Sequence, residues 1–337
     1  RGSRAIGIHP VVLERFDHLG VGDAVVRAGV AVRSGRAVGA AGLLGELDLT
    51  RAGGPRPFVL SCPQARTEEI LERSLASRRP GALRRGAEVV AARRVHGGAE
   101  VVLARGGEVR ASFVVGCDGK RSTVRRAAGL ELQGRRYPYT FLMGEVADTT
   151  GWGDEAVLFL HRDGVVESFP LPEGVRRWVV RTSHFIEDPS PEDLFGPVRD
   201  RTGVDLSGLE PSMLSPFGTE RRLAPALHSG PYLLAGDAGH VVSPIGGQGM
   251  NLGLLDTHDA ARCLERILRQ EAEPRPTLAG YTVRRRSSAR RAARRAELNM
   301  ALGRGGPLVR LRDPLLSLVL RSPLRTILVR IFTMRGL

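Results

Sequence analysis

Lysine and aromatic residues are scarce in this sequence, and both shortages bear on its high positive charge. The formal net charge is +14, yet arginine carries almost all of the positive charge and Lys120 is the only lysine. Aromatic residues make up 5% of the chain, which leaves few rings for nucleobases to stack on. We therefore interpret the charge as a compositional preference for arginine and expect no nucleic acid partner.

Cysteines are also few, and long apolar runs are absent. Cys62, Cys117 and Cys263 are an odd number of widely spaced residues, without the paired spacing of metal ligands or of a disulfide framework. No segment resembles a signal peptide, and no apolar run approaches the roughly 18 residues that a membrane span needs. We expect a cytoplasmic protein in a reducing compartment, with no bound metal.

The start of the chain lacks a nucleotide-binding turn. It reads RGSRAIGIHPVVLERFDHLG, with neither a strand nor a G-x-G-x-x-G turn ahead of the predicted helix. A dinucleotide-binding sheet normally has such a turn after its first strand, where the turn holds the pyrophosphate. Because one βαβ unit needs at least about 30 residues, we expect that roughly 35 to 45 residues are missing from this end.

The most informative stretch that is present covers residues 231–264, PYLLAGDAGHVVSPIGGQGMNLGLLDTHDAARCL. The apolar run from Tyr232 to Ala235 predicts a buried parallel strand that ends at Gly236 and Asp237. Asp237 would then lie at the carboxyl edge of a sheet, where its oxygens can accept hydrogen bonds from the hydroxyls of a sugar or sugar alcohol. Gly236 allows a ligand to come close to the backbone.

Three glycines follow in this stretch and lead into a predicted helix. Gly246, Gly247 and Gly249 precede leucines at roughly helical spacing between Leu252 and Leu268. Unpaired N–H groups at such a helix start favour an anion, or an oxygen that gains negative charge during a reaction. The glycines taken alone are equally consistent with a turn that binds nothing.

A second motif, VVGCDGKRSTVRRAAGL, ends a predicted three-stranded meander over residues 86–115. It places Asp118 and Gly119 at the end of the last strand, with Ser122 and Arg125 following at helical spacing. It is no phosphate-binding P-loop, because it lacks the first glycine of that loop and has no Ser or Thr directly after the lysine. Arg125 by itself is also explained by an ion pair with a nearby carboxylate.

Together these motifs resemble a known family. GDAGHVVSPIGGQGMNLGLLD is similar to the second FAD motif of the single-component flavoprotein monooxygenases, the aromatic-ring hydroxylases typified by para-hydroxybenzoate hydroxylase. The segment around Asp118 is similar to the DG motif of that family. The resemblance implies that Asp237 holds the ribityl chain of FAD, that residues 247–251 contact the flavin ring, and that Pro244 faces the ring. It also implies that Asp118 serves both FAD and the reducing nicotinamide.

The resemblance assigns two further residues outside these motifs, and it assigns no catalytic side chain with certainty. Gln64 would contact the flavin, although a polar surface position explains it nearly as well. Arg4 would approach the FAD phosphates, and the alternative is a solvated terminal arginine. His240 would hold its loop without transferring protons. The full set of implied cofactor-binding residues is Arg4, Gln64, Asp118, Gly119, Arg125, Gly236, Asp237, Pro244, Gly246, Gly247, Gly249, Met250 and Asn251.

The fold implied by the resemblance is α/β, with a Rossmann-like FAD-binding sheet interleaved with an antiparallel β substrate domain and followed by C-terminal helices. The alternation of apolar and polar residues after Gly129 independently predicts antiparallel strands. Phe141, Met143, Phe159, Phe169 and Trp178 within them suggest an apolar or aromatic guest, although core packing explains each one singly at least as well. We assign residues 1–20, 63–130 and 221–270 to the FAD-binding domain, 21–62 and 131–220 to the substrate domain, and 271–337 to a C-terminal helical region.

The activity implied by the resemblance is FAD-dependent hydroxylation. NAD(P)H would reduce the flavin, and oxygen would form a C4a-hydroperoxyflavin that transfers one oxygen atom to an aromatic or other apolar small molecule. The choice between NADH and NADPH, and between monomer and homodimer, stays open. So does the binding of FAD by a chain that lacks the first glycine turn.

Three other functions remain alternatives. A flavin-dependent reductase of isoprenoid double bonds would share the same FAD motifs. A halogenase is disfavoured, because the Trp-x-Trp-x-Ile-Pro signature of that branch is missing and Trp152 and Trp178 stand apart. An inactive basic remnant would bind membranes or nucleic acid instead. The arginine-rich, partly apolar residues 271–337 either pack on the FAD-binding domain or rest on an anionic membrane surface, and we favour packing.

Overall fold

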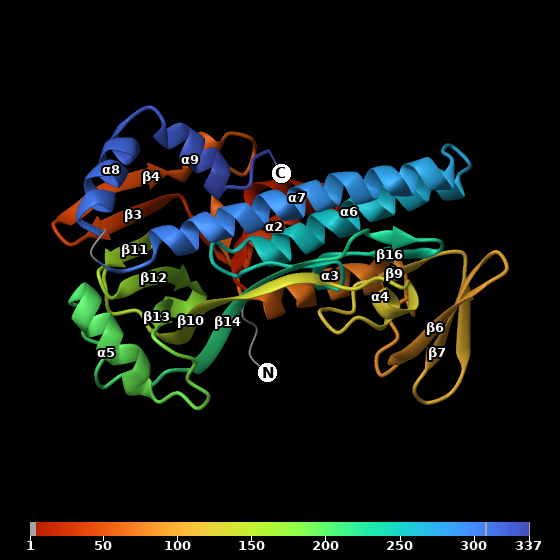
Figure 1. Ribbon diagram of the computed structural model, residues 1–337, viewed down its shortest axis with the longest axis horizontal. Coiled ribbons are helices and arrows are strands. Elements are labelled where there is room, and N and C mark those ends of the chain that lie inside the picture. Colours follow the sequence, from red (N-terminus) through yellow and green to blue (C-terminus); the bar gives the residue numbers. More distant parts are fainter. Residues whose placement is uncertain (1–4, 307–308, 337) are drawn as a thin grey trace.

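The structure is a computed structural model that describes residues 5–306 and 309–336, and it combines four sheets with helices of very different length (Figure 1). The long helices gather along one side of the molecule, where α6 and α7 lie side by side. The described helices are α1 (Pro10–His18), α2 (Gly22–Arg27), α3 (Gln64–Arg78), α4 (Thr123–Ala127), α5 (Pro191–Thr202), α6 (Gln248–Leu268), α7 (Pro274–Leu302), α8 (Val309–Arg321) and α9 (Arg325–Phe332), with short 3-10 turns η1 (Leu49–Ala52), η2 (Pro172–Gly174) and η3 (Gly236–Ala238).

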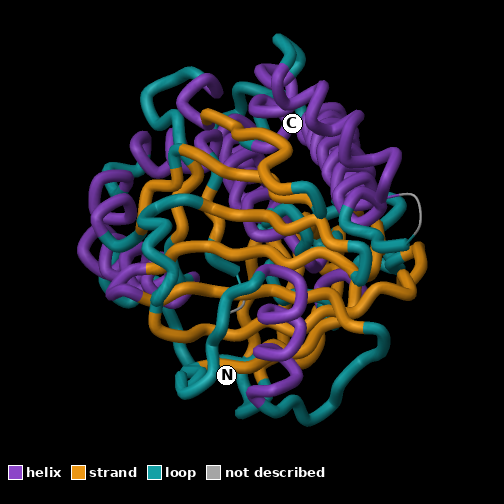
Figure 2. The backbone as a smooth tube through the Cα atoms, turned by 90° about the vertical axis from the view of Figure 1, so that its left-hand side faces the viewer, coloured by secondary structure: helices purple, strands orange, loops and turns teal. Residues whose placement is uncertain are grey.

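The largest sheet has eight strands and confirms the predicted antiparallel β region. Every neighbouring pair in it is antiparallel except β3 and β11, which are parallel. Figure 2 shows its strands stacked across the molecule. In spatial order its strands are β17 (His240–Val241), β14 (Met213–Leu223), β10 (Gln133–Ala147), β13 (Val175–Thr182), β12 (Gly164–Leu171), β11 (Ala156–His161), β3 (Ser34–Gly39) and β4 (Gly42–Asp48).

The two faces of this sheet are covered by different elements, because successive side chains of a strand point to opposite faces. One face packs around Trp178, which is fully buried, and against Leu194 of α5. The other face carries Phe141 and Met143, and these pack with Ile245, which lies just before the α6 start, and with Met300 of α7. This second face therefore looks towards the glycine-rich loop, and we call it the loop-side face.

A small mixed sheet holds the two predicted motif strands. In it, β16 (Tyr232–Leu234) lies between β15 (His228–Ser229) and β9 (Val114–Gly116), and β16 runs parallel to β9. All three residues of β16 are buried, as the apolar run predicted.

The predicted meander is real, but its boundary was wrong. It consists of β6 (Val89–Val95), β7 (Gly98–Leu103) and β8 (Glu108–Ala111). We had expected one continuous strand up to Val115. The chain instead leaves the meander after Ala111, and β9 joins the other sheet, because its backbone finds its partners along β16.

The third small sheet pairs β5 (Val59–Ser61) with β1 (Gly7–Ile8) on one side and β2 (Val30–Val32) on the other. Its core is shared with α1, α2 and α3. Residues 21–62 thus supply strands to two different sheets, since β3 and β4 belong to the eight-stranded one. The domain boundaries that we drew from the sequence stay predictions.

The C-terminal helices pack against the eight-stranded sheet and its surroundings. Leu320 of α8 is buried against Gly45 of β4, and Val329 of α9 is fully buried beside η1. On the outer side of α8, however, Leu311, Leu315 and Leu318 are exposed. Across residues 5–306 and 309–336, none of the helices has the length and apolar character needed to cross a bilayer.

Candidate functional site

The structure brings the two predicted acidic motifs to the same edge of one sheet. Leu234 of β16 is paired with Gly116 of β9, and the N–H of Ala235 donates to the Gly116 carbonyl at 3.0 Å. Because the strands are parallel, their carboxyl ends meet at one edge, and Asp118 and Asp237 both follow there. The sequence predicted each strand end, and the pairing of the strands now places the ends next to each other.

Arg125 joins the two motifs through its guanidinium. From α4, its Nη1 donates to the carbonyl of Ala238 at 2.9 Å, and its Nη2 donates to the carbonyl of Lys120 at 2.9 Å. Its side chain is buried, and desolvation lowers its pKa from the usual value for arginine. The alternative of an ion pair with a carboxylate is wrong, since both hydrogen-bond partners of the guanidinium are backbone carbonyls. Arg125 therefore holds the strand-end loops in fixed relative positions.

Asp118 has one carboxylate oxygen engaged within the protein. Its Oδ2 accepts the N–H groups of Thr123 at 2.7 Å and Val124 at 3.1 Å, which are the first N–H groups of α4. Gly119 follows with φ of 74°, a conformation that glycine adopts without strain. The Asp118 side chain is exposed, so it combines a fixed orientation with access from solvent.

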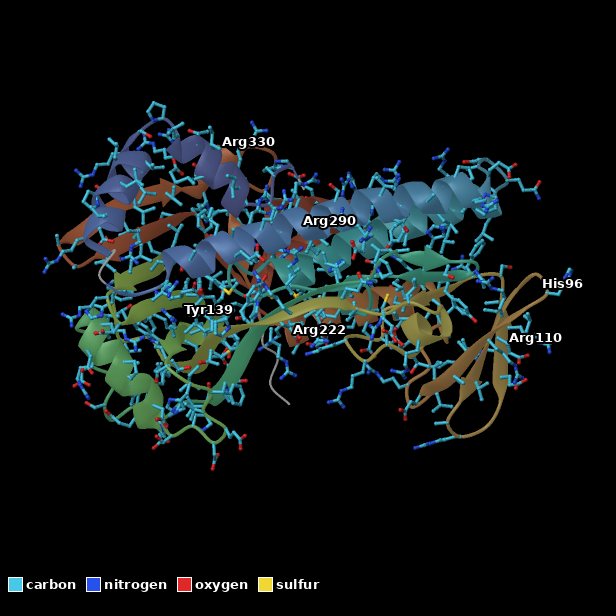
Figure 3. All side chains as sticks on the ribbon, viewed as in Figure 1. His96, Arg110, Tyr139, Arg222, Arg290 and Arg330 are labelled. Atoms are coloured by element: carbon cyan, nitrogen blue, oxygen red, sulfur yellow. The ribbon has the colours of Figure 1, made fainter. Side chains whose placement is uncertain are left out.

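Asp237 carries the unpaired carboxylate of the site. It is exposed, and no N–H or O–H of residues 5–306 or 309–336 donates to it. Desolvation by the surrounding protein raises the pKa of this carboxyl. The nearby charges of His240 and Lys120 lower the pKa, but they offset only part of this increase. Lys120 itself pairs with Glu220, and Arg222 of β14 binds the other oxygen of Glu220 at 2.8 Å (Figure 3). Asp237 is therefore free to accept hydrogen bonds from a ligand.

Two glycines allow α6 to pass close to this loop. Gly236 has φ of 60°, and a Cβ atom on Gly253 of α6 would lie 3.2 Å from the Gly236 Cα atom. This contact is too tight for most side chains. The pairing of Gly236 with Gly253 thus fixes the distance between η3 and the first turns of α6, which the sequence had not predicted.

A buried ion cluster supports the same loop from beneath. Asp256 of α6 is fully buried, and its Oδ2 lies 2.5 Å from His240 Nε2 and accepts the Gly236 N–H at 2.9 Å. Its Oδ1 accepts Arg285 Nε from α7 at 2.6 Å. Burial alone would raise the pKa of Asp256, but attraction and hydrogen bonds from His240 and Arg285 outweigh it and hold this pKa below its usual value. His240 holds the loop, as the sequence suggested, and it does so through Asp256.

The glycine loop presents the start of a long helix. Gly246 and Gly247 have φ of 91° and 65°, and Gly247 is the N-cap of the 21-residue α6. The Gly247 N–H donates to the Pro244 carbonyl at 2.9 Å and closes a turn. The free donors at this end are therefore the first N–H groups of α6 itself, starting at Gln248, which have no partner within the helix. Pro244 and Gly247 are exposed beside them.

Asn251 fastens this helix start to the beginning of the described chain. Its Oδ1 accepts the His9 N–H at 2.9 Å, and its Nδ2 donates to the carbonyls of Gly7 and Gly247 at 2.8 Å each. The side chain is fully buried, so its amide is used up by the protein. We had assigned Asn251 to the cofactor. Its side chain instead shapes the loop, and only its backbone remains available.

His9 was not assigned to the site from the sequence, and it lies against the glycine loop. Its side chain is 5% exposed, and burial lowers its pKa to about 4. Hydrogen bonds with the backbone of Gly246 and Gly247 raise the pKa, but they offset only part of the effect of burial. Its Nδ1 has no partner among the described residues. His9 is thus a neutral side chain that braces the loop at ordinary pH.

The remaining predicted residues fall into three groups. Gln64 is the first residue of α3, where its N–H donates to the Ala5 carbonyl and its Nε2 donates to Glu68 at 2.6 Å. Gly249 and Met250 lie in the first turn of α6, and Met250 packs with the core under α1. Arg4 lies outside the described residues.

Asp256 and Arg285 are the site-supporting residues that the sequence analysis missed. A signal for Asp256 was present, because it shares the buried stripe of α6 with Leu252 and Ala260. We had placed Leu268 on this stripe, but it is 63% exposed. Arg285 gave a weaker signal, since α7 carries arginines on most of its faces.

A separate cavity of about 440 Å³ opens at the end of the eight-stranded sheet. It is lined by the turn between β11 and β12, by the end of β13, and by Arg201, Arg304 and the two glycines that follow Arg304. None of its lining residues belongs to either acidic motif or to the glycine loop. It is therefore not part of the site described above.

Comparison with known proteins adds a family and several relatives. The profile of the family described as FAD binding domain matches residues 1–296. A rifampicin monooxygenase of Streptomyces venezuelae is 34% identical over 266 residues, which are 76% of this chain and 54% of the relative. A dialkyldecalin synthase of Streptomyces rugosporus is 32% identical over 220 residues, 61% of this chain and 46% of that relative.

Solved structures show the same similarity in three dimensions. The anhydrotetracycline hydroxylase OxyS from Streptomyces rimosus superposes with a TM-score of 0.80 and 28% identity, over 100% of this chain and 69% of that one. The chain spans about half the length of the curated relatives that it matches.

Proposed function

This chain belongs to the FAD-binding-domain family of single-component flavoprotein monooxygenases, and from this premise we propose that it binds FAD between its two acidic strand ends and hydroxylates an aromatic or other apolar small molecule. NAD(P)H would be the reductant and molecular oxygen the second substrate. One observation carries the proposal. Asp118 and Asp237 follow the ends of two parallel, paired strands, and Arg125 joins the loops that carry them. The exposed start of α6 follows the Asp237 loop.

The residues present fit FAD. Asp237 has a free carboxylate at a sheet edge, which suits a ligand rich in hydroxyls such as the ribityl chain. Gly236 and Gly247 have positive φ and carry no side chain that would keep a ligand away from the backbone. The first N–H groups of α6 are unpaired donors at the positive end of a helix, where an electron-rich oxygen is stabilised.

Each protein group then has a defined task. Asp237 would hold the ribityl hydroxyls, and the N–H groups of Gln248 and Gly249 would bind an oxygen of the flavin ring that becomes negative on reduction. Pro244 would contact the ring. Asp256 and Arg285 would act from beneath by holding the loop. When bound, FAD supplies the redox chemistry, namely acceptance of a hydride and activation of oxygen, which this protein's side chains do not provide.

The loop-side face of the eight-stranded sheet would form the wall of the substrate site. It places Phe141, Met143 and Phe217 in one apolar cluster with Ile245, the residue between Pro244 and Gly246. The rings of Phe141 and Phe217 stack at 5.3 Å. An apolar wall beside the flavin loop favours an aromatic guest and keeps water away from the reacting atoms.

The test is FAD retention by the purified chain, both as given and fused behind a family βαβ segment. After gel filtration with excess FAD, we expect oxidised-flavin absorbance bands from at least one form. Asp237→Ala should weaken FAD binding about 10- to 100-fold, because it removes hydrogen bonds to a charged acceptor worth about 1.5–3 kcal/mol. Asp259→Ala is the matched control, since Asp259 is an aspartate of the same helix that accepts hydrogen bonds from Arg284 of α7 instead of facing the loop. Two colourless forms would contradict the proposal.

Oxygen uptake separates hydroxylation from related activities. An NAD(P)H-dependent, substrate-stimulated uptake of oxygen is expected for a hydroxylase. The likeness to a dialkyldecalin synthase favours one second candidate, a ring-forming enzyme. Product formation without oxygen consumption would support that candidate. NAD(P)H oxidation that continues without oxygen, in the presence of an isoprenoid lipid, would support a reductase.

Contact of the C-terminal helices with a membrane is also a proposal. The exposed leucines of α8 are flanked by the exposed Arg310 and Arg321 at the two ends of the helix, which suits an anionic lipid surface. Co-sedimentation with vesicles of phosphatidylglycerol, compared with phosphatidylcholine, tests it. Equal sedimentation of wild type and a Leu311→Ser, Leu315→Ser, Leu318→Ser variant would rule it out.

A further inference from the structure

The separate cavity at the end of the eight-stranded sheet is lined mostly by positive charge. Its lining includes Arg162, Arg181, Arg201 and Arg304, and Asp163 is its only acidic residue. Its volume of about 440 Å³ lies within the range of roughly 300–1,000 Å³ that is typical of small-molecule sites. None of its lining side chains is aromatic or apolar. The cavity therefore differs in chemistry from the apolar wall beside the flavin loop.

Most of this positive charge has no counter-charge within the protein. Asp163 Oδ1 lies 3.7 Å from Arg162 Nε, which is a long ion pair between exposed side chains. No carboxylate of residues 5–306 and 309–336 forms an ion pair with Arg181, Arg201 or Arg304. Four arginines against one aspartate leave three positive charges in excess around one opening. Such a group of like charges is unfavourable unless an anion joins it.

Arg201 is held in the cavity wall at the end of α5. Its Nη1 donates to the Arg181 carbonyl at 2.8 Å, and its other N–H groups donate to no atom of the described residues. The side chain is half-buried, and desolvation lowers its pKa from the usual value for arginine. The charge of Arg181 lowers this pKa further, and attraction to Asp163 and Asp200 offsets only part of the decrease. Arg201 is therefore a positioned guanidinium with free donors.

The loop after α7 is fixed against the turn between β11 and β12. The Gly306 N–H donates to the Arg162 carbonyl at 2.8 Å, and a Cβ atom on Gly305 would lie 1.9 Å from the same oxygen. A side chain at position 305 would therefore push the loop away. Arg312 Nη2 of α8 donates to the Leu160 carbonyl at 2.7 Å and ties α8 to the end of β11. These contacts hold the backbone around the cavity in place without a ligand.

The lining matches a phosphate group better than a carboxylate or a nucleobase. Guanidinium groups donate pairs of hydrogen bonds to the oxygens of a phosphate, and Ser183 adds a hydroxyl to the lining. A phosphomonoester carries about 1.5 to 2 negative charges at pH 7, which balances the excess better than the single charge of a carboxylate does. A nucleobase would find no ring to stack on.

We propose that this cavity binds the phosphate group of a ligand that is not a nucleotide, through Arg181, Arg201 and Arg304. The proposal goes beyond the flavin function and does not depend on it. Two sources have this chemistry, namely a soluble phosphomonoester or diphosphate and the headgroup of an anionic phospholipid. The lipid source has support from α8, which follows the cavity loop along the chain and exposes its leucines. Figure 1 shows α5 and α8 at the same end of the molecule.

Calorimetry with inorganic pyrophosphate, at pH 7.5 and low salt, tests the cavity on the purified chain. Arg201→Gln and Arg304→Gln should each weaken binding about tenfold, because each removes charge-assisted hydrogen bonds. Arg105→Gln is the matched control for loss of one positive charge, since Arg105 is exposed between β7 and β8 at the other end of the molecule (Figure 1). Unchanged affinity in both cavity variants, or an equal loss in Arg105→Gln, would overturn the proposal. Acetate that binds as well as pyrophosphate, or ADP that binds more tightly, would overturn the ligand class.

Arg304→Gln keeps the test valid if Arg201→Gln fails to fold, because the Arg304 side chain is exposed. Co-sedimentation with vesicles of phosphatidic acid then separates the two sources. Sedimentation that falls in Arg304→Gln and is inhibited by pyrophosphate would assign the site to a lipid headgroup. Arginine-dependent pyrophosphate binding without either effect on sedimentation would assign it to a soluble ligand. The Leu311→Ser, Leu315→Ser, Leu318→Ser variant should bind pyrophosphate as the wild type does, and loss of binding there would contradict a site inside the cavity.

Discussion

The Nε2 atom of His240 lies 2.5 Å from the Oδ2 atom of Asp256, and both side chains are withdrawn from solvent beneath the Asp237 loop. Arg285 completes the cluster from α7 at 2.6 Å. Three segments that are far apart in the sequence are therefore held together by ionic and hydrogen-bonding contacts. The position of the loop that carries Asp237 therefore depends on buried side chains beneath it.

The first prediction concerns this cluster. Asp256→Asn should destabilise the protein by about 3–5 kcal/mol, because it leaves the Arg285 charge buried without its partner. Urea unfolding followed by circular dichroism measures the loss. Asp259→Asn is the matched control on the same helix, where a more exposed pair with Arg284 should be worth about 0–1 kcal/mol. Equal losses of unfolding free energy in the two variants would show that the buried cluster contributes no more to stability than the exposed pair.

The pH dependence of this cluster has a definite sign. The pKa of Asp256 is lower in the folded protein than in the unfolded chain. Its contribution to stability is therefore present above the unfolded value of about 3.9 and is lost as the pH falls through the folded value. The wild type should lose more stability than Asp256→Asn when the pH is lowered below 4.

A second prediction concerns the contact between α6 and η3. Gly253→Ala places a Cβ atom 3.2 Å from the Gly236 Cα atom and should push the helix start away from the Asp237 loop. We expect about 1–3 kcal/mol of destabilisation, as for overpacking, together with weaker FAD retention. Gly280→Ala in α7 is the control, because its Cβ atom would meet only the flexible end of Arg284. That substitution should be neutral or slightly stabilising, since alanine favours helix.

A third prediction concerns Arg125. Arg125→Lys keeps the charge but cannot serve the carbonyls of Lys120 and Ala238 with one planar group. It should lower the affinity for FAD by about tenfold or more and reduce the midpoint of thermal unfolding by a few degrees. Arg126→Lys is the control on the same short helix, where the guanidinium is exposed. FAD titrations monitored by flavin fluorescence would detect the difference in affinity between the two variants. Identical titrations would argue against a role for the two hydrogen bonds of Arg125 in FAD binding.

Parts of the site could be predicted because their signals are local. Asp118 and Asp237 each follow an apolar strand directly, so a short window of sequence was enough to place them at strand ends. The parallel pairing that puts them side by side was implied only by the family. The fold class was also accessible, since alternation of apolar and polar residues revealed the antiparallel sheet.

Other parts could not be predicted, because their cause is a contact between distant segments. Asn251 looked like a ligand of the flavin, yet the carbonyl of Gly7, 244 positions away, takes its amide. The sequence analysis did not single out Asp256 and Arg285, because their contact joins two different helices, α6 and α7.

A fourth prediction concerns His9. Burial lowers its pKa to about 4 in the folded protein, against an ordinary histidine pKa of 6.5. The unfolded chain therefore takes up a proton first as the pH falls, and stability should drop by about 3 kcal/mol between pH 6.5 and 4 through this residue. His9→Gln should reduce this acid sensitivity. His96→Gln, at the exposed tip of the β6–β7 hairpin, should leave it unchanged (Figure 3). The same slope in all three proteins would exclude His9 as its source.

The last prediction concerns Glu167, whose effect on stability has the opposite sign. Its pKa of about 7 in the folded protein lies above the ordinary glutamate pKa of 4.5, so the folded protein retains a proton that the unfolded chain has lost. Stability should therefore fall as the pH rises from 4.5 to 7, because the carboxyl must ionise in apolar surroundings. Glu167→Gln should match the wild type near pH 5 and exceed it in melting temperature at pH 8. A gap that does not depend on pH would mean that Glu167 is already solvated and titrates as a surface residue does.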